Sequence, residues 1–201
     1  MDTIKYQLNA RRQPYGQGVD LSLLNESVGN EVLAFHQKFP DYRVTPLRKL
    51  EFLSQRLGLG SIHIKDEAQR FGLNAFKGLG GSYAMGKYLA ALLERDINTL
   101  SFTELNSPVI KARIKDIVFV TATDGNHGRG VAWAAEQLGL RAVVYMPKGS
   151  SPVRAQNIRR HGAECTITEL NYDDTVRLAA KTAREQGWVL LQDTAWQGYE
   201  Q

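Results

Sequence analysis

The second half of the chain repeats one pattern, in which a short apolar run is followed by a longer amphipathic stretch and then by glycine. Apolar runs of this kind are typical of strands buried on both faces of a sheet, whereas the longer stretches have helical spacing. Glycine readily adopts the left-handed backbone conformation that often ends a helix. The pattern predicts strands at 117–120, 141–146, 165–168 and 188–191, and helices at 128–138, 152–160 and 173–186. Strand, helix and strand in this order indicate βαβ units, so we expect an α/β fold with a parallel sheet covered by helices on both faces.

The first half of the chain is less regular. Residues 1–40 are polar apart from one amphipathic stretch, 31–39, and predict a packed extension. Alternating apolar and polar residues at 62–65 predict a half-buried strand, and a helix is expected over 76–94. Residues 95–115 mix charged and polar side chains and predict a surface connection that holds only short helices.

Composition and charge exclude several classes of function. The 201 residues include 25 Lys and Arg against 21 Asp and Glu, for a net charge of +4, and the basic residues stand singly or in pairs. Because a nucleic-acid-binding protein would show a basic stripe or a recognition module, we expect no nucleic-acid partner. No apolar run is long enough for a membrane span or a signal peptide. The single cysteine, Cys165, allows neither an internal disulfide nor a thiolate metal cluster, so we expect a cytoplasmic protein with no metal site and no membrane partner.

Polar side chains cluster directly after the strand predicted at 117–120. Asp124, Asn126 and His127 lie next to Gly125 and Gly128, just before a predicted helix. In parallel sheets ligands bind beyond the carboxyl ends of the strands, and the free N–H groups of a helix N-terminus suit an anion. A capping role for Thr123 or Asp124 is the alternative. The concentration of polar side chains between glycines favours a binding site.

Lys77 lies among apolar residues and glycines at the start of a predicted helix. The helix dipole opposes a positive charge there, and positions 73 and 81, one turn away, are Leu and Gly. Desolvation and this field favour the neutral amine, which is the form that Schiff-base chemistry requires. The alternative is a lysine that extends along the surface and keeps its charged end in water.

These motifs resemble those of the fold-type II pyridoxal-phosphate enzymes, the family of the tryptophan synthase β subunit and threonine dehydratase. The resemblance rests on Asn74-Ala75-Phe76-Lys77 and on Asp124-Gly125-Asn126-His127-Gly128, with support from 145–149, 171–178 and 192–196. Within the family the motifs are most similar to those of the diaminopropionate ammonia-lyases, from about residue 36 onward. The resemblance implies a three-layer αβα fold with a parallel sheet, pyridoxal 5'-phosphate as cofactor and a small-molecule amino-acid substrate.

The resemblance also implies roles for individual residues. Lys77 occupies the position that carries the cofactor as an internal aldimine, and Asn126 that of the residue that hydrogen-bonds the pyridoxal 3'-oxygen. Asp124 stands where most relatives have a hydroxyl residue. Bases on opposite faces of the planar cofactor, Lys77 and Asp124, would remove the α-proton from either enantiomer of the substrate. Both are therefore candidate catalytic residues.

Three further residues are candidates for binding the substrate. Asp193 follows the last predicted strand, and its carboxylate suits the positive charge of a β-ammonium group. His127 and Tyr172 stand at positions within the matching motifs. For Tyr172 the alternative is a buried, hydrogen-bonded tyrosine with a structural role.

The reaction that the resemblance implies is the α,β-elimination of D- or L-2,3-diaminopropionate to pyruvate and two molecules of ammonia. A threonine or serine dehydratase of the same fold is the first alternative. The acidic side chain of Asp124 disfavours it, because this side chain suits an ammonium-bearing substrate better than a hydroxyl-bearing one. The second alternative is a truncated remnant without catalytic activity.

Length distinguishes this chain from the family it resembles. Family members are about twice as long, and their C-terminal half holds a glycine-rich phosphate loop and the side chain that faces the pyridine nitrogen. Neither is found here, so we expect an incomplete and inactive form of an enzyme that is a homodimer at full length. We expect residues 1–115 to form an N-terminal extension and the first part of a large domain that carries Lys77. Residues 116–201 are expected to form a small α/β domain of βαβ units, with the C-terminal part of the large domain absent.

Overall fold

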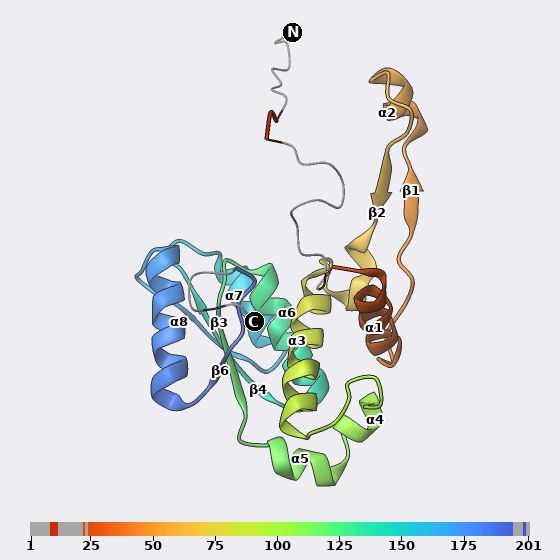
Figure 1. Ribbon diagram of the computed structural model, residues 1–201. Coiled ribbons are helices and arrows are strands. Elements are labelled where there is room, and N and C mark those ends of the chain that lie inside the picture. Colours follow the sequence, from red (N-terminus) through yellow and green to blue (C-terminus); the bar gives the residue numbers. More distant parts are fainter. Residues whose placement is uncertain (1–8, 12–21, 23, 195–198, 200–201) are drawn as a thin grey trace.

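The computed structural model describes residues 9–11, 22, 24–194 and 199, and its centre is a four-stranded sheet (Figure 1). The strands are β3 (Val118–Ala122), β4 (Arg141–Met146), β5 (Glu164–Ile167) and β6 (Val189–Leu190). They lie in the order β5-β4-β3-β6, and every neighbouring pair is parallel. The predicted parallel sheet is therefore confirmed.

Helices cover both faces of this sheet and form the predicted three layers. Along the chain they are α6 (Asn126–Leu138), α7 (Pro152–Arg159) and α8 (Tyr172–Gln186). Helix α8 lies on one face, whereas α6 and α7 lie on the other, where α3 (Lys77–Leu92) packs against α6 and contacts β3 (Figure 1). Helices α6 and α8 end at Gly139 and Gly187, whose left-handed φ angles of 64° and 66° confirm the predicted stops.

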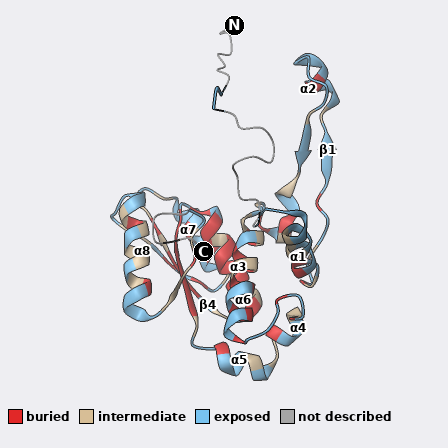
Figure 2. Ribbon diagram, viewed as in Figure 1, coloured by how far each residue is buried: buried red, intermediate tan, exposed pale blue. Residues whose placement is uncertain are grey.

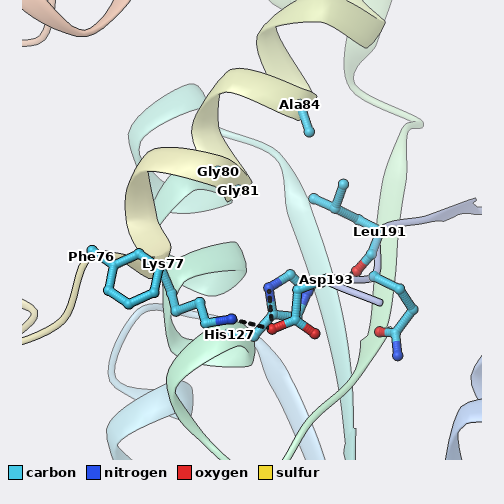
Figure 3. Close-up of a pocket in the computed structure, with 9 residues that line it drawn as sticks. Phe76, Lys77, Gly80, Gly81, Ala84, His127, Leu191 and Asp193 are labelled. Carbon is cyan, nitrogen blue, oxygen red and sulfur yellow. Dashed lines mark hydrogen bonds and ion pairs between the residues drawn. The ribbon is translucent and has the colours of Figure 1, made fainter. Parts of the chain in front are cut away.

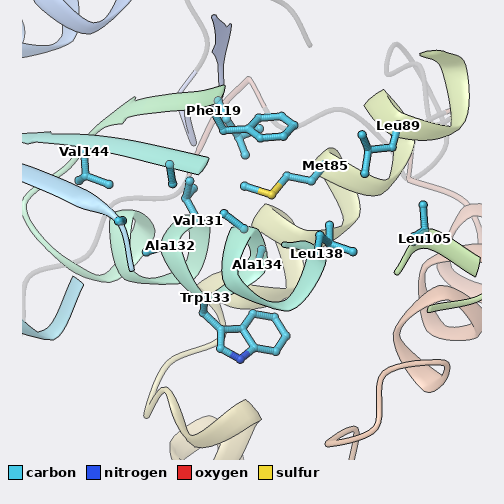
Figure 4. Close-up of a cluster of buried hydrophobic side chains, with 14 of the residues drawn as sticks. Met85, Leu89, Leu105, Phe119, Val131, Ala132, Trp133, Ala134, Leu138 and Val144 are labelled. Carbon is cyan, nitrogen blue, oxygen red and sulfur yellow. The ribbon is translucent and has the colours of Figure 1, made fainter. Parts of the chain in front are cut away.

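The largest apolar core lies between α3, α6 and the sheet (Figure 4). Met85 and Leu89 of α3 meet Val131 and Leu138 of α6, and Phe119 of β3 completes the cluster; each of the five is fully buried. Alternate residues of β3 point to the other face and pack against α8. Because both faces of the sheet are covered, successive residues of these strands are apolar.

The first half of the chain supplies helices around this body. Helix α1 (Glu26–Gln37) begins five residues before the predicted stretch, because Asn25 caps it by accepting a hydrogen bond from the backbone N–H of Val28. Phe35 and His36 of α1 are buried, so this part of the expected extension packs against the body, whereas most of residues 1–23 lies outside the described residues. The predicted surface connection contains two short helices, α4 (Phe102–Leu105) and α5 (Pro108–Ile114).

A hairpin extends from the body (Figure 2). Strand β1 (Leu47–Lys49) pairs antiparallel with β2 (His63–Lys65); α2 (Glu51–Arg56) lies between them, and a short 3-10 segment, η1 (Glu67–Gly72), follows β2. The predicted strand at 62–65 is confirmed, but its half-burial is wrong, since all of β2 is exposed and Ile64 is 47% exposed. The physical reason is that β2 pairs only with β1, and no described layer covers either face of this pair. No helix within the described ranges is long and apolar enough to cross a membrane.

Candidate active site

The strand order of the sheet creates one point at which two loops diverge. From β3 the chain adds β4 and then β5 on one side, and β6 is later added on the other side of β3. Ligands of open parallel sheets bind at such a switch point, beyond the carboxyl ends of the strands. The loop 123–125 after β3 and the segment 191–194 after β6 flank this point.

A cavity of about 260 Å³ lies beside this switch point, and three charged or polar side chains converge in it (Figure 3). The Nζ atom of Lys77 is 2.6 Å from Oδ2 of Asp193 and donates a hydrogen bond to it. Nδ1 of His127 lies 3.9 Å from the same oxygen. The three side chains come from the start of α3, the first turn of α6 and the residues after β6. The cavity is lined by Phe76, Lys77, Gly80, Gly81, Ala84, His127, Leu191, Gln192 and Asp193.

The acidic partner of Lys77 comes from 116 residues further along the chain. Burial raises the pKa of the Asp193 carboxyl, but the hydrogen bond from Lys77, the nearby ring of His127 and the charge of Lys77 outweigh it and hold the pKa below its ordinary value. The side chains of Lys77 and Asp193 are 32% and 26% exposed, so the pair is reached from solvent through the cavity. The amine therefore points into the site and does not extend along the surface.

His127 is buried and neutral. Its Nε2–H donates a hydrogen bond of 3.0 Å to the carbonyl oxygen of Leu191, because a carbonyl can only accept. Burial is the largest influence on the ring and lowers its pKa, against the opposing effects of this hydrogen bond and of Asp193. His127 therefore links α6 to the segment after β6 and leaves Nδ1 as an acceptor facing the cavity.

Asp124 does not cap helix α6. Oγ1 of Thr123 accepts the hydrogen bonds from the backbone N–H groups of Gly125 and Gly128, so Thr123 satisfies the helix start. The Asp124 carboxylate is exposed, and among the described residues it has no hydrogen bond or ion pair. Its backbone carbonyl accepts a hydrogen bond from Arg154. The capping alternative is therefore wrong for Asp124 and confirmed for Thr123.

Tyr172 and Asn126 lie outside the lining of the cavity. Tyr172 is the first residue of α8 and is 38% exposed, so the buried structural alternative is wrong. Partial burial raises the pKa of its phenol, and the negative charges of Asp193 and Asp124 add to this effect. The phenol therefore lies within electrostatic reach of both carboxylates. Asn126 is the first residue of α6, and it is exposed.

Gln192 is a site residue that the sequence did not single out. Its Oε1 accepts a hydrogen bond of 2.9 Å from the backbone N–H of Ala122 and another from the hydroxyl of Thr121, which ties β6 to β3. Its Nε2 is buried in the cavity wall without a hydrogen-bond partner in the described part of the chain. The available signal was its place directly before Asp193, at the end of a strand.

The residues present fit an aromatic aldehyde cofactor such as pyridoxal phosphate. Lys77 offers the amine that condenses with an aldehyde, and the unpaired Nε2 of Gln192 offers a buried donor to an oxygen or nitrogen acceptor. Phe76 and Leu191 supply apolar wall for a ring. A cavity with a few polar groups among apolar ones is typical of cofactor sites.

Comparison with known proteins gives a consistent set of similarities. A family model described as pyridoxal-phosphate dependent enzyme matches residues 38–201. A diaminopropionate ammonia-lyase of Salmonella typhimurium is 75% identical over 200 residues, which are 100% of this chain and 50% of that protein. The crystal structure of diaminopropionate ammonia lyase from Escherichia coli in complex with D-serine has a TM-score of 0.84 at 50% identity; the match covers 89% of this chain and 45% of that one. A biosynthetic L-threonine dehydratase of Salmonella typhimurium is 32% identical over 80% of this chain and 28% of its own length.

The chain spans about half the length of the curated ammonia-lyases it matches. The matched half contains Lys77 and the loops after β3 and β6. A fold shared with the solved ammonia-lyase confirms the predicted three-layer α/β architecture.

Proposed function

Because the chain belongs to the family of pyridoxal-phosphate-dependent enzymes, we propose that it carries the lysine-bearing half of an ammonia-lyase site for 2,3-diaminopropionate. The overall reaction consumes one water and yields pyruvate and two molecules of ammonia. The observation that carries the proposal is the amine of Lys77, held 2.6 Å from the Asp193 carboxylate inside a cavity at the switch point of the sheet. The much higher identity to diaminopropionate ammonia-lyases than to threonine dehydratases supports this substrate.

Different residues of the chain are proposed to attach the cofactor, to transfer protons and to bind the cofactor ring. Pyridoxal phosphate, when bound, supplies the electron sink that makes the substrate α-proton acidic. Lys77 is the attachment point for its aldehyde carbon and a base for that proton. Gln192 offers the unpaired Nε2 donor to the bound ring, and Asn126 is proposed to reach its 3'-oxygen.

Two carboxylates suit a substrate that carries a second ammonium group. Asp193 already holds an ammonium, that of Lys77, and can hold the β-ammonium of the substrate by the same charge attraction. Asp124 has a carboxylate without a partner among the described residues and is free to accept a proton. The phenol of Tyr172 lies near both, and we assign it and His127 to the substrate side of the site. Hydroxyl-bearing serine and threonine gain nothing from this second negative charge.

The proposal extends to the architecture of the longer protein. We propose that residues 1–115 belong to a large domain, which sequence beyond this half completes, and that residues 116–201 form the small domain. Support comes from the hairpin, since Leu47, Phe52 and Ile64 are exposed apolar residues on a two-stranded unit. Isolated hairpins are marginally stable, so a covering layer is expected. We also propose a homodimer in the cytoplasm, where the lone Cys165 would stay reduced.

The proposal is tested by assaying pyruvate release by the full-length protein, with D- and L-2,3-diaminopropionate, serine and threonine as substrates. We expect diaminopropionate to have the highest kcat/KM and the 201-residue chain alone to release no pyruvate. A preference for threonine or serine would replace the proposal by the dehydratase alternative. Inactivity of the full-length protein toward all four would favour the non-catalytic remnant.

A further inference from the structure

The segment directly before Lys77 has an unusual backbone. Phe71, Gly72 and Asn74 have φ angles of 49°, 68° and 53°, so three of four consecutive residues are in the left-handed region. This region is open to glycine and tolerated by Asn but unfavourable for Phe, because its Cβ atom crowds the backbone. Such a conformation persists only where the surrounding structure holds it, and it is found preferentially at functional sites.

One face of helix α6 makes the contacts that hold this segment. Arg129 donates hydrogen bonds from its two terminal nitrogens, at 3.0 Å to the carbonyl oxygen of Leu73 and at 3.4 Å to that of Gly72. One turn later, Trp133 stacks on the ring of Phe71, with ring centroids 4.3 Å apart and planes inclined by 20°. Residues four apart lie on the same side of a helix, so Arg129 and Trp133 both contact the segment 71–74 from one face of α6.

Gly130, between these two residues, brings α6 against the backbone of Lys77 itself. A Cβ atom at position 130 would lie 2.8 Å from the carbonyl carbon and oxygen of Lys77, closer than such atoms can approach. The same helix therefore fixes the residues before Lys77 and the peptide group of Lys77. The backbone is held on both sides, and the side chain points into the cavity toward Asp193 (Figure 3).

The guanidinium of Arg129 is not placed for stability alone. Its Nε is buried and has no hydrogen-bond partner in the part of the chain that the structure describes. A buried unpaired donor is unfavourable, and a shorter neutral side chain would avoid it. The two contacts that compensate for it both go to the segment before Lys77.

We infer that Arg129 is a positioning residue, which fixes the left-handed segment 71–74 and thereby aims the amine of Lys77 into the cavity. It acts through the backbone carbonyls of Gly72 and Leu73 and touches no reacting atom. The inference rests on the proposed function only for its catalytic consequence. The structural consequence is that Arg129 fixes residues 71–74, and it does not depend on a bound ligand.

The structural consequence is tested by hydrogen exchange in the 201-residue chain without cofactor. We expect Arg129→Ala to speed exchange of the amides at 72–77 by about tenfold or more, because hydrogen bonds from a charged group are lost. Amides of β3 and β4 should be unchanged. Arg141→Ala is the matched control, since Arg141 pairs on the surface with Glu164 at 2.9 Å, and it should leave residues 72–77 unchanged.

Arg129→Lys keeps the charge and one donor nitrogen. It is the second variant, for the case in which Arg129→Ala speeds amide exchange in the whole chain. We expect a smaller rise in exchange, confined to residues 72–77. Unchanged exchange there in both variants, or a rise of the same size in the Arg141→Ala control, would overturn the inference.

The catalytic consequence is tested in the full-length protein, through the absorption of lysine-bound cofactor and the separation of kcat from KM. We expect Arg129→Ala to weaken the absorption and to lower kcat by about 100-fold, since small misplacements of a reacting group have effects of this size. Arg129→Lys should restore part of both. Wild-type absorption and kcat in Arg129→Ala would contradict the inference and leave the proposed function intact. Absence of lysine-bound cofactor in the wild-type protein would instead refute the proposed function, and the inference would then be decided by the exchange result alone.

Discussion

At the scale of single residues, the site is organised around the carboxylate of Asp193. One of its oxygens accepts the hydrogen bond of Lys77 at 2.6 Å and faces the ring of His127 at 3.9 Å. The same carboxylate is the group to which we assign the β-ammonium of the substrate. On this proposal Asp193 would direct the amine before substrate enters and would offer its charge to the substrate afterwards.

Replacing Asp193 by Asn distinguishes a role in activity from a role in the stability of the fold. We expect the free energy of unfolding of the chain to fall by less than about 1 kcal/mol, because partly exposed ion pairs contribute little. We expect kcat/KM of the full-length protein for diaminopropionate to fall by about 100-fold or more, because a positioned charged or proton-transferring side chain typically contributes a rate factor of about that size. Urea denaturation and pyruvate release measure the two effects. A large loss of stability with activity retained would contradict the assignment.

Replacing Asp124 by Asn tests whether it is the second base. Asn has nearly the same shape and cannot accept a proton, so we expect turnover of one enantiomer of diaminopropionate to fall by about 100-fold and that of the other by far less. Asp173→Asn is the control, because Asp173 is an exposed aspartate in the first turn of α8. Equal losses for both enantiomers would remove Asp124 from this role.

The sequence located the site residues better than it located their contacts. Lys77, His127 and Asp193 all follow from motifs and from the rule that ligands bind beyond strand ends, and the structure brings the three together. The Lys77 to Asp193 pair could not be predicted, because it depends on β6 lying beside β3 and not beside β5. Gln192 was missed for the same reason, since its partners belong to β3.

At the scale of elements, the crossing of α3 and α6 is the contact that places the site. Glycines make the close approach possible: a Cβ at Gly130 would meet the backbone of Lys77, and one at Gly81 would lie 3.4 Å from the backbone of Gly130. Gly78 and Gly81 therefore serve helix packing, whereas no atom lies within 4 Å of a Cβ at Gly80.

Substituting Gly130 by Ala tests this crossing. We expect the free energy of unfolding to fall by about 1–3 kcal/mol, because the methyl group has no space and the backbone of Lys77 must shift. Gly29→Ala in α1 is the matched control, since no atom lies within 4 Å of the added methyl group. It should stabilise the chain by about 0.5–1 kcal/mol through helix propensity. Thermal or urea unfolding of both variants measures the difference, and equal stability of the two would contradict the packing account.

The elements of the sheet were predictable, whereas of the hairpin strands only β2 was predicted and β1 was not. Burial on both faces gives β3 and β4 continuous apolar runs, and glycine ends α6 and α8, so the predicted bounds differ from the observed ones by only a few residues. Strand β1 is exposed at all three positions, and its sequence carries no pattern that burial would impose. Helix α6 starts at Asn126, two residues before the predicted start, and the candidate cap Thr123 accepts the hydrogen bond of the Gly128 N–H.

At the scale of the whole molecule, two buried histidines couple stability to pH. Burial lowers the pKa of His36 and of His127 below the ordinary value of 6.5. Each ring is therefore neutral in the folded chain and takes up a proton more readily when unfolded. The stabilisation is full above pH 6.5 and is lost as the pH falls below that value toward the folded pKa of each ring.

We therefore expect the free energy of unfolding to decrease between about pH 7 and pH 5. His127→Gln should flatten this dependence, because one of the two groups no longer titrates. Surface His63, which is exposed on the hairpin, provides the control variant His63→Gln, in which the slope should be unchanged. Urea denaturation at several pH values measures the slope. A slope that His127→Gln leaves as steep as before would contradict the assignment.

The central claim is that Lys77 is the residue that binds the cofactor covalently, and borohydride reduction tests it most directly. The full-length protein is mixed with pyridoxal phosphate, reduced and digested, and the labelled peptide is identified by mass spectrometry. We expect the label on Lys77, and its loss in Lys77→Ala without label at another lysine. Label on a different lysine, or none in the wild-type protein, would contradict the account.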